Sequence, residues 1–152
     1  DGEGLATHKT ALIDKGVLMG WLLDSASARQ LGAEPTGHAS RGTGGAPGVS
    51  VTNVYMRAGT ASPRDLMHGI ARGIYVTELI GMGVNPVTGD YSRGASGFLI
   101  ENGAVSHAVT EITIAGNLKD MFAALIPAND LQFRYAINTP TLRIDGMTVA
   151  GG

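Results

Sequence analysis

The chain has 152 residues, with 11 Lys+Arg against 13 Asp+Glu and a formal net charge of −2 at pH 7. This balance excludes a strongly basic protein that binds nucleic acid by neutralising phosphates. The longest apolar run, from Val17 to Leu23, is far shorter than the roughly 20 residues of a membrane-spanning helix. The sequence has no cysteine, which excludes disulfides, a thiolate nucleophile and a cysteine-ligated metal.

Glycine is unusually frequent and charge is unusually rare. The sequence has 23 glycines and 16 % charged residues, whereas typical soluble proteins have about 7 % glycine and about 25 % charged residues. Few charges predict that another domain or subunit covers part of the surface. The chain begins Asp1-Gly2-Glu3-Gly4 without Met or a targeting segment, so we expect further residues upstream.

The first half of the chain predicts short elements around a long loop. Apolar runs over residues 9–14 and 17–24 flank Lys15-Gly16, a two-residue turn typical of a hairpin. Residues 25–31 favour a short helix, and residues 49–56 favour a strand. Residues 31–48 contain six glycines and two prolines, which predicts a long irregular loop that is either functional or a mobile surface connection.

The second half predicts two helices and several strands. Ser62-Pro63 is typical of a helix start, and we expect that helix to end at Gly73. Asn102-Gly103 is the strongest hairpin signal in the sequence. The other predicted elements are strands over residues 73–80, 98–101, 104–109 and 111–115, a dense turn over 81–97, a helix over 117–126 and a last hairpin over 141–144 and 147–149.

The predicted fold is α+β, in a single domain over residues 1–152. The 117–126 helix has an apolar stripe at i, i+3, i+4, i+7 and i+8, which predicts a core-facing side. Three hairpins and two main helices imply a mostly antiparallel sheet. Because strands rich in glycine bend easily, we expect the sheet to be curved or partly closed.

Metal coordination is not predicted for this chain, and no metal ligand is assigned. The four histidines are His8, His38, His68 and His107. Their spacing excludes a His-Glu-x-x-His helix. Asp65 and His68 share a helix face, but Arg72 on the same side favours a solvated surface. His107 and Glu111 share a strand face, which cross-strand pairing explains equally well.

The sequence also contains no complete catalytic set, so no catalytic residue is assigned. The segment Gly94-Ala95-Ser96-Gly97-Phe98 resembles Gly-x-Ser-x-Gly but lacks its second glycine and precedes a strand instead of a helix. Residues 42–48 lack the Lys-Ser/Thr pair of a phosphate-binding loop. In the same segment, Pro47 stands where the third glycine of a dinucleotide fingerprint belongs.

Residues 81–97 are the segment with the clearest functional composition. An arginine and a carboxylate beside exposed backbone are suited to holding a peptide terminus or a partner strand. A hydrogen-bonded structural turn is the alternative, because Asn-Pro and Thr-Gly-Asp are common turn formers. The residues that we assign to peptide or partner contact are Asn85, Thr88, Asp90, Tyr91 and Arg93.

Long motifs in this sequence resemble the C-terminal domain of the TldD/PmbA family, and the PmbA (TldE) branch more than TldD. The resemblance covers essentially the whole chain. It rests on residues 81–103, on Glu111 to Leu118 and on Arg72 to Glu78, with Asp1 to Gly4 before them and Leu142 to Gly151 after them, all in the same order.

The resemblance implies a subunit of a cytoplasmic metalloprotease that degrades or matures peptides. TldD-type proteins hold zinc with a His-Glu-x-x-x-His helix, upstream of the region seen here, and with a cysteine near the C-terminus. Residues 133–140, where that cysteine is expected, have none. The resemblance therefore implies a PmbA-like chain that binds no metal and supports a zinc-carrying TldD-like partner. Its other expected contacts are its own N-terminal domain and a peptide substrate, with no membrane and no direct nucleic-acid contact, and a homo-oligomer stays open.

Two alternatives remain at this point. The first is a non-proteolytic interaction module that modulates DNA gyrase, a role also given to PmbA proteins. The second is an independent hydrolase that uses Ser96, His107 or His68 with a nearby acid. That alternative requires these side chains to lie within about 3 Å of one another, and we expect them to be apart.

Overall fold

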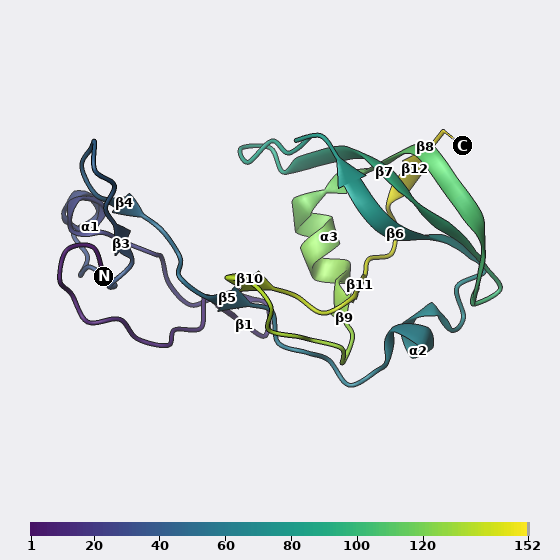
Figure 1. The fold of residues 1–152 in the computed structure, drawn as a ribbon, viewed down its shortest axis with the longest axis horizontal. Coiled ribbons are helices and arrows are strands. Elements are labelled where there is room, and N and C mark those ends of the chain that lie inside the picture. The colour runs from purple at the N-terminus through teal and green to yellow at the C-terminus, as the bar shows by residue number, and fades with distance from the viewer. Residues whose placement is uncertain (152) are drawn as a thin grey trace. The chain divides into compact units, whose positions relative to one another are not determined.

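The computed structural model describes residues 1–151, which form two compact units (Figure 1). The first unit consists of residues 1–54 and 135–137, and the second of residues 55–134 with the described residues from 138 onward. The chain passes from one unit to the other after Val54, after Arg134 and after Ile137. The first and last of these points lie within β5 (Val54–Tyr55) and β10 (Ile137–Asn138). Each unit is described by itself below.

The first unit contains short elements and a helix with two well-formed ends. The helix α1 (Ser25–Leu31) was predicted with these bounds. Asp24 caps its start by accepting a hydrogen bond from the Ser27 N–H at 2.7 Å, and Gly32 ends it in the left-handed conformation. The strands of this unit are β1 (Ile13–Asp14), β2 (Val17–Leu18), β3 (Ala39–Ser40) and β4 (Gly48–Val49).

The strands of the first unit are much shorter than predicted. The turn at Lys15-Gly16 is confirmed, but each strand of its hairpin has only two residues. Its apolar side chains stay exposed, with Trp21 66 % accessible, so no buried face extends the pairing. The predicted strand over 49–56 is wrong as one element, because β4 ends at Val49 and β5 begins only at Val54.

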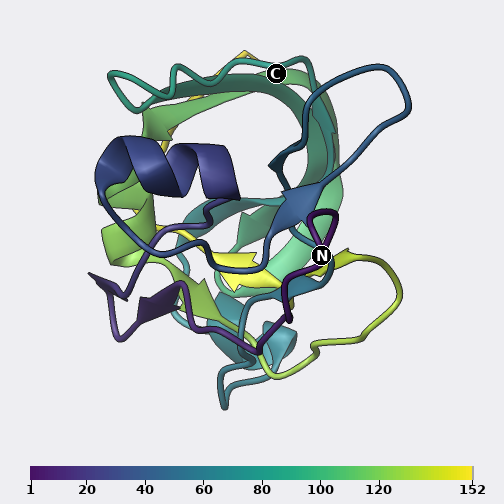
Figure 2. The same ribbon diagram turned by 90° about the vertical axis from the view of Figure 1, so that its left-hand side faces the viewer.

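The second unit is built on a four-stranded antiparallel sheet in the order β12-β8-β7-β6. The long strands β7 and β8 bend along their length (Figures 1 and 2), and β6 and β12 form the two edges. The mostly antiparallel, curved sheet is therefore confirmed. The strands are β6 (Arg72–Ile80), β7 (Asp90–Glu101), β8 (Ala104–Asn117) and β12 (Thr148–Ala150).

The hairpin of β7 and β8 forms around Asn102-Gly103, as predicted. Both residues have positive φ, 49° and 79°, which a two-residue turn of this kind requires. Residues 90–97 were predicted as part of a turn and instead begin β7. The local glycines suggested a turn there, whereas pairing with β8 along this segment makes it a strand.

A bulge interrupts β8 at Glu111. The pairing passes from Gly97 with Val109 to Ala95 with Ile112, so two residues of β8 lie opposite one residue of β7. Glu111 has a φ of 56°, which is uncommon outside glycine. The core of the unit lies beside this bulge and consists of Ala95, Ile112 and Ile114, with Ile74, Val76, Tyr91, Val109 and Met147 packed against it.

The helix α2 (Pro63–Met67) starts where it was predicted to start. Ser62 accepts a hydrogen bond from the Asp65 N–H at 3.1 Å, and the Asp65 carboxylate accepts one from the Ser62 N–H at 3.1 Å. This is a capping box. The predicted end at Gly73 is wrong, because the helix stops before His68 and Gly73 lies in β6.

The helix α3 (Leu118–Ala124) is capped by Asn117 as predicted. Its apolar stripe was expected to be core, and this is wrong for the described residues. None of the helical residues is buried, and Phe122 is 64 % exposed. The Met121 side chain of this helix lies over Gly116 of β8. The described residues thus contain three helices, the short one and the two main ones that were predicted.

The predicted C-terminal hairpin around Asp145-Gly146 is also wrong. Its first strand, β11 (Leu142–Arg143), pairs with β9 (Ile126–Pro127), and its second, β12, pairs with β8. The guanidinium of Arg143 binds the Asp145 carboxylate at 2.9 Å and also donates to the Leu66 carbonyl at 2.9 Å. The bond to Leu66 joins β11 to α2.

Gly97 is a position where a side chain does not fit. A Cβ added there would lie 2.0 Å from the Tyr75 carbonyl oxygen, whereas one at Gly94 in the same strand would lie 3.4 Å from Ile80. We expect Gly97→Ala to lower the free energy of unfolding by about 1–3 kcal/mol. The matched Gly94→Ala change should cost less than about 0.5 kcal/mol. Urea unfolding measures both, and equal effects would contradict this account of the close approach.

Asp130 gives the fold a defined acid sensitivity. Its carboxylate accepts hydrogen bonds from the Thr141 hydroxyl at 2.7 Å and the Thr141 N–H at 2.8 Å, which lower its pKa below the ordinary 3.8. Because the folded-state pKa is depressed, this stabilisation is present above pH 3.8 and is lost as the pH falls through the lowered value. Carboxyl NMR titration should show Thr141→Val moving the pKa of Asp130 back toward 3.8, and an unchanged pKa would contradict this assignment.

Candidate functional site

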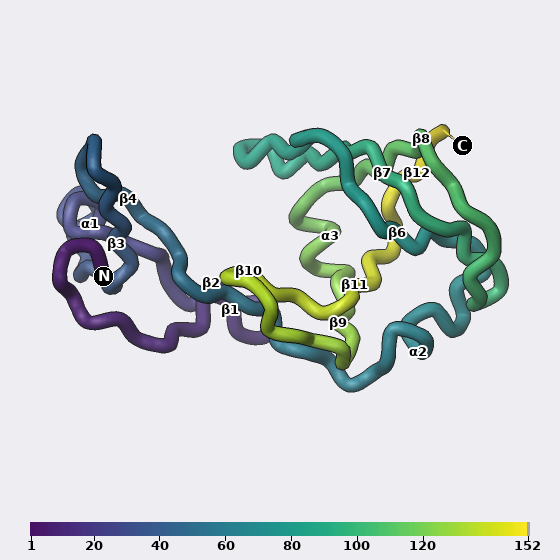
Figure 3. The backbone as a smooth tube through the Cα atoms, in the orientation of Figure 1, coloured from purple at the N-terminus to yellow at the C-terminus, as the bar shows by residue number. Residues whose placement is uncertain are grey.

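The residues predicted for partner contact lie at the turn between β6 and β7. This turn, residues 81–89, extends beyond the end of the sheet (Figures 1 and 3). Asn85 and Thr88 lie within it, and Asp90, Tyr91 and Arg93 begin β7. The structure thus places all five predicted residues in one continuous segment, and their hydrogen bonds show what each of them does.

Asn85 folds the tip of the turn. Its side-chain oxygen accepts hydrogen bonds from the N–H groups of Val87 at 2.9 Å and Thr88 at 3.3 Å, a local pattern typical of asparagine in turns. Its main-chain N–H donates to the Asp90 carbonyl, and its carbonyl accepts from the Gly89 N–H, both at 2.8 Å. The functional groups of Asn85 are therefore used inside the turn.

A second group of hydrogen bonds joins Thr88, Asp90 and Asn117. The Thr88 hydroxyl donates to the Asp90 carboxylate at 2.7 Å. The Asn117 side-chain amide donates to the Thr88 carbonyl at 3.1 Å and to the Asp90 carboxylate at 3.4 Å, while its oxygen caps α3. The Asp90 carboxylate is thus bound within the chain, and the turn is joined to the start of α3.

Two glycines let the turn close tightly on its neighbours. A Cβ at Gly83 would lie 1.5 Å from the Ser92 carbonyl oxygen, and the Ser92 N–H donates to the Gly83 carbonyl at 2.7 Å. Gly89 has a φ of 84° and lies against the Asn117 side chain, and its carbonyl accepts from the Leu118 N–H at 2.7 Å. Only glycine combines this conformation with this approach.

Tyr91 and Arg93 are used differently from the polar residues of the turn. Tyr91 is half-buried, pairs with Val84 across the turn and packs against the core of the sheet. The Arg93 guanidinium donates from Nη2 to the Leu79 carbonyl at 3.2 Å, and its buried Nε has no partner in the described part of the chain. Of the five predicted residues, Arg93 is the one with an unmet buried donor.

The turn also exposes apolar side chains, which the sequence analysis missed. Met82 is 96 % exposed and Val87 is 91 % exposed. The sequence held one signal for them, because the nine residues from Gly81 to Gly89 contain no charged side chain.

The residues considered for hydrolysis form no catalytic pair. The Ser96 hydroxyl lies 3.5 Å from the Glu78 carboxylate, and His107 lies 3.3 Å from the Ser106 hydroxyl. None of the hydrogen bonds described for residues 1–151 joins Ser96 to His107 or His68. Asp65, considered with His68 as a metal pair, is bound in the capping box, and the Ser62 hydroxyl lowers the pKa of its carboxyl.

The side chains of residues 1–151 that could ligate a metal are not arranged as a metal site. Within residues 1–151, no group of three or more His, Cys, Asp or Glu side chains is placed to hold a metal ion. Structural and catalytic zinc sites use at least three such ligands. No helix in the same range is long and apolar enough to cross a membrane.

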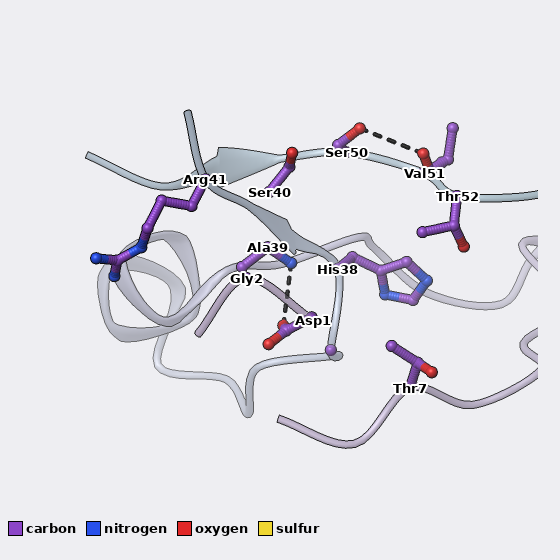
Figure 4. A pocket seen from close by; sticks show the side chains of 11 residues that line it. Asp1, Gly2, Thr7, His38, Ala39, Ser40, Arg41, Ser50, Val51 and Thr52 are labelled. Carbon is purple, nitrogen blue, oxygen red and sulfur yellow. Dashed lines mark hydrogen bonds between the residues drawn. The ribbon is translucent and has the colours of Figure 1, made fainter. Parts of the chain in front are cut away.

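A hollow of about 250 Å³ in the first unit contains one imidazole (Figure 4). His38 lines it between Thr7 and Thr52, with its Nδ1 2.9 Å from the Thr36 hydroxyl. The Asp1 carboxylate also lines it, but accepts hydrogen bonds from three backbone N–H groups. The residues that line this hollow therefore offer no acid–base pair.

The comparisons with known proteins identify the family. A family model described as the PmbA/TldA metallopeptidase C-terminal domain matches residues 1–151. The chain belongs to the PmbA/TldD metallopeptidase family.

Two curated relatives place the chain within this family. It is 42 % identical over 152 residues to the metalloprotease PmbA of Escherichia coli O157:H7, covering 99 % of this chain and 32 % of that protein. It is 27 % identical over 168 aligned residues to a metalloprotease TldD homolog of Haemophilus influenzae, covering 99 % of this chain and 35 % of that protein. The chain spans about a third of the length of the curated relatives that it matches.

Two solved structures share the fold. TldE from Thermococcus kodakarensis has a TM-score of 0.87 at 29 % identity, covering 98 % of this chain and 35 % of that one. A Thermotoga maritima protein described as a candidate modulator of a DNA gyrase has a TM-score of 0.82 at 33 % identity, covering 99 % of this chain and 35 % of that one. The fold expected from the resemblance is thus confirmed.

We expect Asn85→Ala to loosen the turn while leaving the sheet intact. The change removes the acceptor of the Val87 and Thr88 N–H groups, at a cost of about 1 kcal/mol. Hydrogen exchange at these two amides should accelerate, with no change at Ile112 or Ile114 in the core. Asn53→Ala, at an exposed asparagine, is the control. Unchanged protection at Val87 and Thr88 would show that Asn85 does not hold the turn.

Proposed function

We propose that this chain is the C-terminal domain of a PmbA-type (TldE-type) subunit that supports a TldD-type metalloprotease without binding the metal itself. In this proposal, residues 1–152 act as one domain, the partner subunit carries zinc and the catalytic groups, and the complex cleaves peptides in the cytoplasm. The chain contributes shape and a contact surface.

The arrangement of the side chains that could ligate a metal is the main support for this proposal. The relatives are metalloproteases by name, yet the side chains of residues 1–151 do not converge as metal ligands, and the sequence has no cysteine. The higher identity to PmbA than to the TldD homolog supports the PmbA branch. The alignment lengths agree: PmbA aligns over 152 residues, whereas the TldD homolog needs 168 and so carries insertions relative to this chain.

The turn at residues 81–89 supports the contact role. It is held by bonds from Asn85, Thr88 and Asn117 and carries two exposed apolar side chains. We assign Tyr91 and Arg93 to the base of the same surface. A rigid turn with these properties is suited to docking against a protein.

A second candidate function is modulation of DNA gyrase without proteolysis. The observation that favours it is the Thermotoga maritima structure, whose description names a candidate modulator of a DNA gyrase. Affinity capture separates the two functions, because recovery of gyrase without any TldD-type subunit favours the second.

Metal content and peptide cleavage test the first proposal. We expect the protein alone to bind less than about 0.1 zinc per chain and to leave an unfolded peptide intact. Mixed with a TldD-type subunit, it should give a complex with about one zinc that cleaves the peptide and is inactivated by a chelator. Stoichiometric zinc and cleavage by the isolated protein would overturn the proposal.

A further inference from the structure

We propose that Asn102 is a site of spontaneous, irreversible modification, and that residues 67–71, at the end of α2 and before β6, control when it reacts. The reaction converts the side-chain amide of Asn102 into a carboxylate. In part of the product it also moves the peptide link onto the side chain. The site lies at the tip of the β7–β8 hairpin and is separate from the turn assigned to partner contact.

Asn102-Gly103 is the one Asn-Gly pair of the sequence. Because glycine has no Cβ, nothing beside its main-chain nitrogen blocks the approach of the asparagine side chain. The Gly103 nitrogen can lose its proton and attack Cγ of Asn102. As the new N–C bond forms, the bond from Cγ to the side-chain nitrogen breaks, and ammonia leaves with the proton. Water, the only co-reactant, then opens the cyclic imide at either carbonyl, which gives aspartate or isoaspartate.

The Asn102 side chain is free to take part in this reaction. It is exposed, and within residues 1–151 it makes no hydrogen bond. The side chains of Asn85 and Asn117, in contrast, are bound in the turn between β6 and β7. Rotation of the Asn102 side chain toward the Gly103 nitrogen therefore breaks no hydrogen bond.

The attacking nitrogen, however, is held in the folded protein. The Gly103 N–H donates to the Ile70 carbonyl at 2.8 Å, and the Asn102 N–H donates to the Ala71 carbonyl at 2.9 Å. A Cβ at Gly103 would lie 3.4 Å from the Met67 carbonyl oxygen, so residues 67–71 lie directly against the tip. Attack requires the nitrogen to leave its bond to Ile70 and to give up its proton. Local opening of residues 67–71 is therefore the step that starts the reaction.

The modification changes the end of the hairpin permanently. Asn102 and Gly103 have φ values of 49° and 79°, which the two-residue turn requires. Isoaspartate lengthens the main chain by a methylene group, so the turn no longer matches the pairing of Glu101 with Ala104. Aspartate keeps the chain length but places a second carboxylate next to Glu101. A brief opening of residues 67–71 is thus converted into a lasting change at the tip.

Gly69→Ala tests the control by residues 67–71. Gly69 has a φ of 82° and open space at its Cβ position, so alanine adds backbone strain without a collision. Opening relieves this strain, and we expect Asn102 to react about five- to thirtyfold faster at neutral pH. Gly16→Ala is the matched control, because Gly16 has a φ of 80° and equally open surroundings but lies between β1 and β2. Its rate should equal that of the unchanged protein.

Peptide mapping by mass spectrometry follows the two products over time. Asn102→Gly should give neither product, because it keeps a pair that forms this turn but has no side-chain amide. Hydrogen exchange at the Gly103 amide should accelerate in Gly69→Ala by the same factor as the reaction, while exchange at Ile112 in the core stays unchanged. In urea, the unchanged protein should react at least about tenfold faster than when folded, since unfolding removes the bond to Ile70.

Each part of the proposal has its own contradicting result. Absence of both products even in urea would show that Asn102 is not a modification site. Equal rates in the folded and unfolded protein would show that residues 67–71 exert no control, and this comparison needs no variant. Equal acceleration by Gly69→Ala and Gly16→Ala would assign the effect to general destabilisation and overturn the local control.

Discussion

The side-chain amide of Asn117 is the connection on which the described site depends. Its oxygen starts α3, and its nitrogen holds the carbonyl of Thr88 and the carboxylate of Asp90. One residue at the end of β8 thus fixes a turn that precedes it by almost thirty positions. Without these bonds, the turn would keep its local Asn85 pattern and the Leu118 N–H bond to Gly89, but lose the side-chain bonds to Thr88 and Asp90. The conformation of the turn is therefore a property of tertiary structure and not of the turn sequence alone.

Close backbone approach explains the glycine at one position of the sheet and one position of the turn. At Gly97 the strands β6 and β7 come so near that the Tyr75 carbonyl occupies the place of a side chain, and Gly83 meets Ser92 in the same way. At both positions a side chain larger than hydrogen would collide with the neighbouring backbone.

Local signals in the sequence predicted local structure well. Asn102-Gly103, Ser62-Pro63 and Asn117 each act on adjacent residues, and the structure confirms the turn, the helix start and the cap that they indicate. The errors concern distant partners. Leu142 and Thr148 looked like one hairpin, but they pair with Pro127 and Ala115, which no short pattern shows. The candidate site shows the same division: its segment was chosen from local composition, whereas the exposure of Met82 and Val87 depends on how the whole turn is held.

The bulge at Glu111 changes which positions of β8 face the core. Val109 packs against the core before it, and Ile112 and Ile114 do so after it, so the inward side chains pass from odd to even numbers within one strand. Simple alternation from Val109 would turn residue 111 to the core, so the extra residue of the bulge is what brings Ile112 and Ile114 inward. The bulge, marked by the uncommon backbone conformation of Glu111, therefore decides which positions of β8 face the core, without any chemistry of the Glu111 side chain.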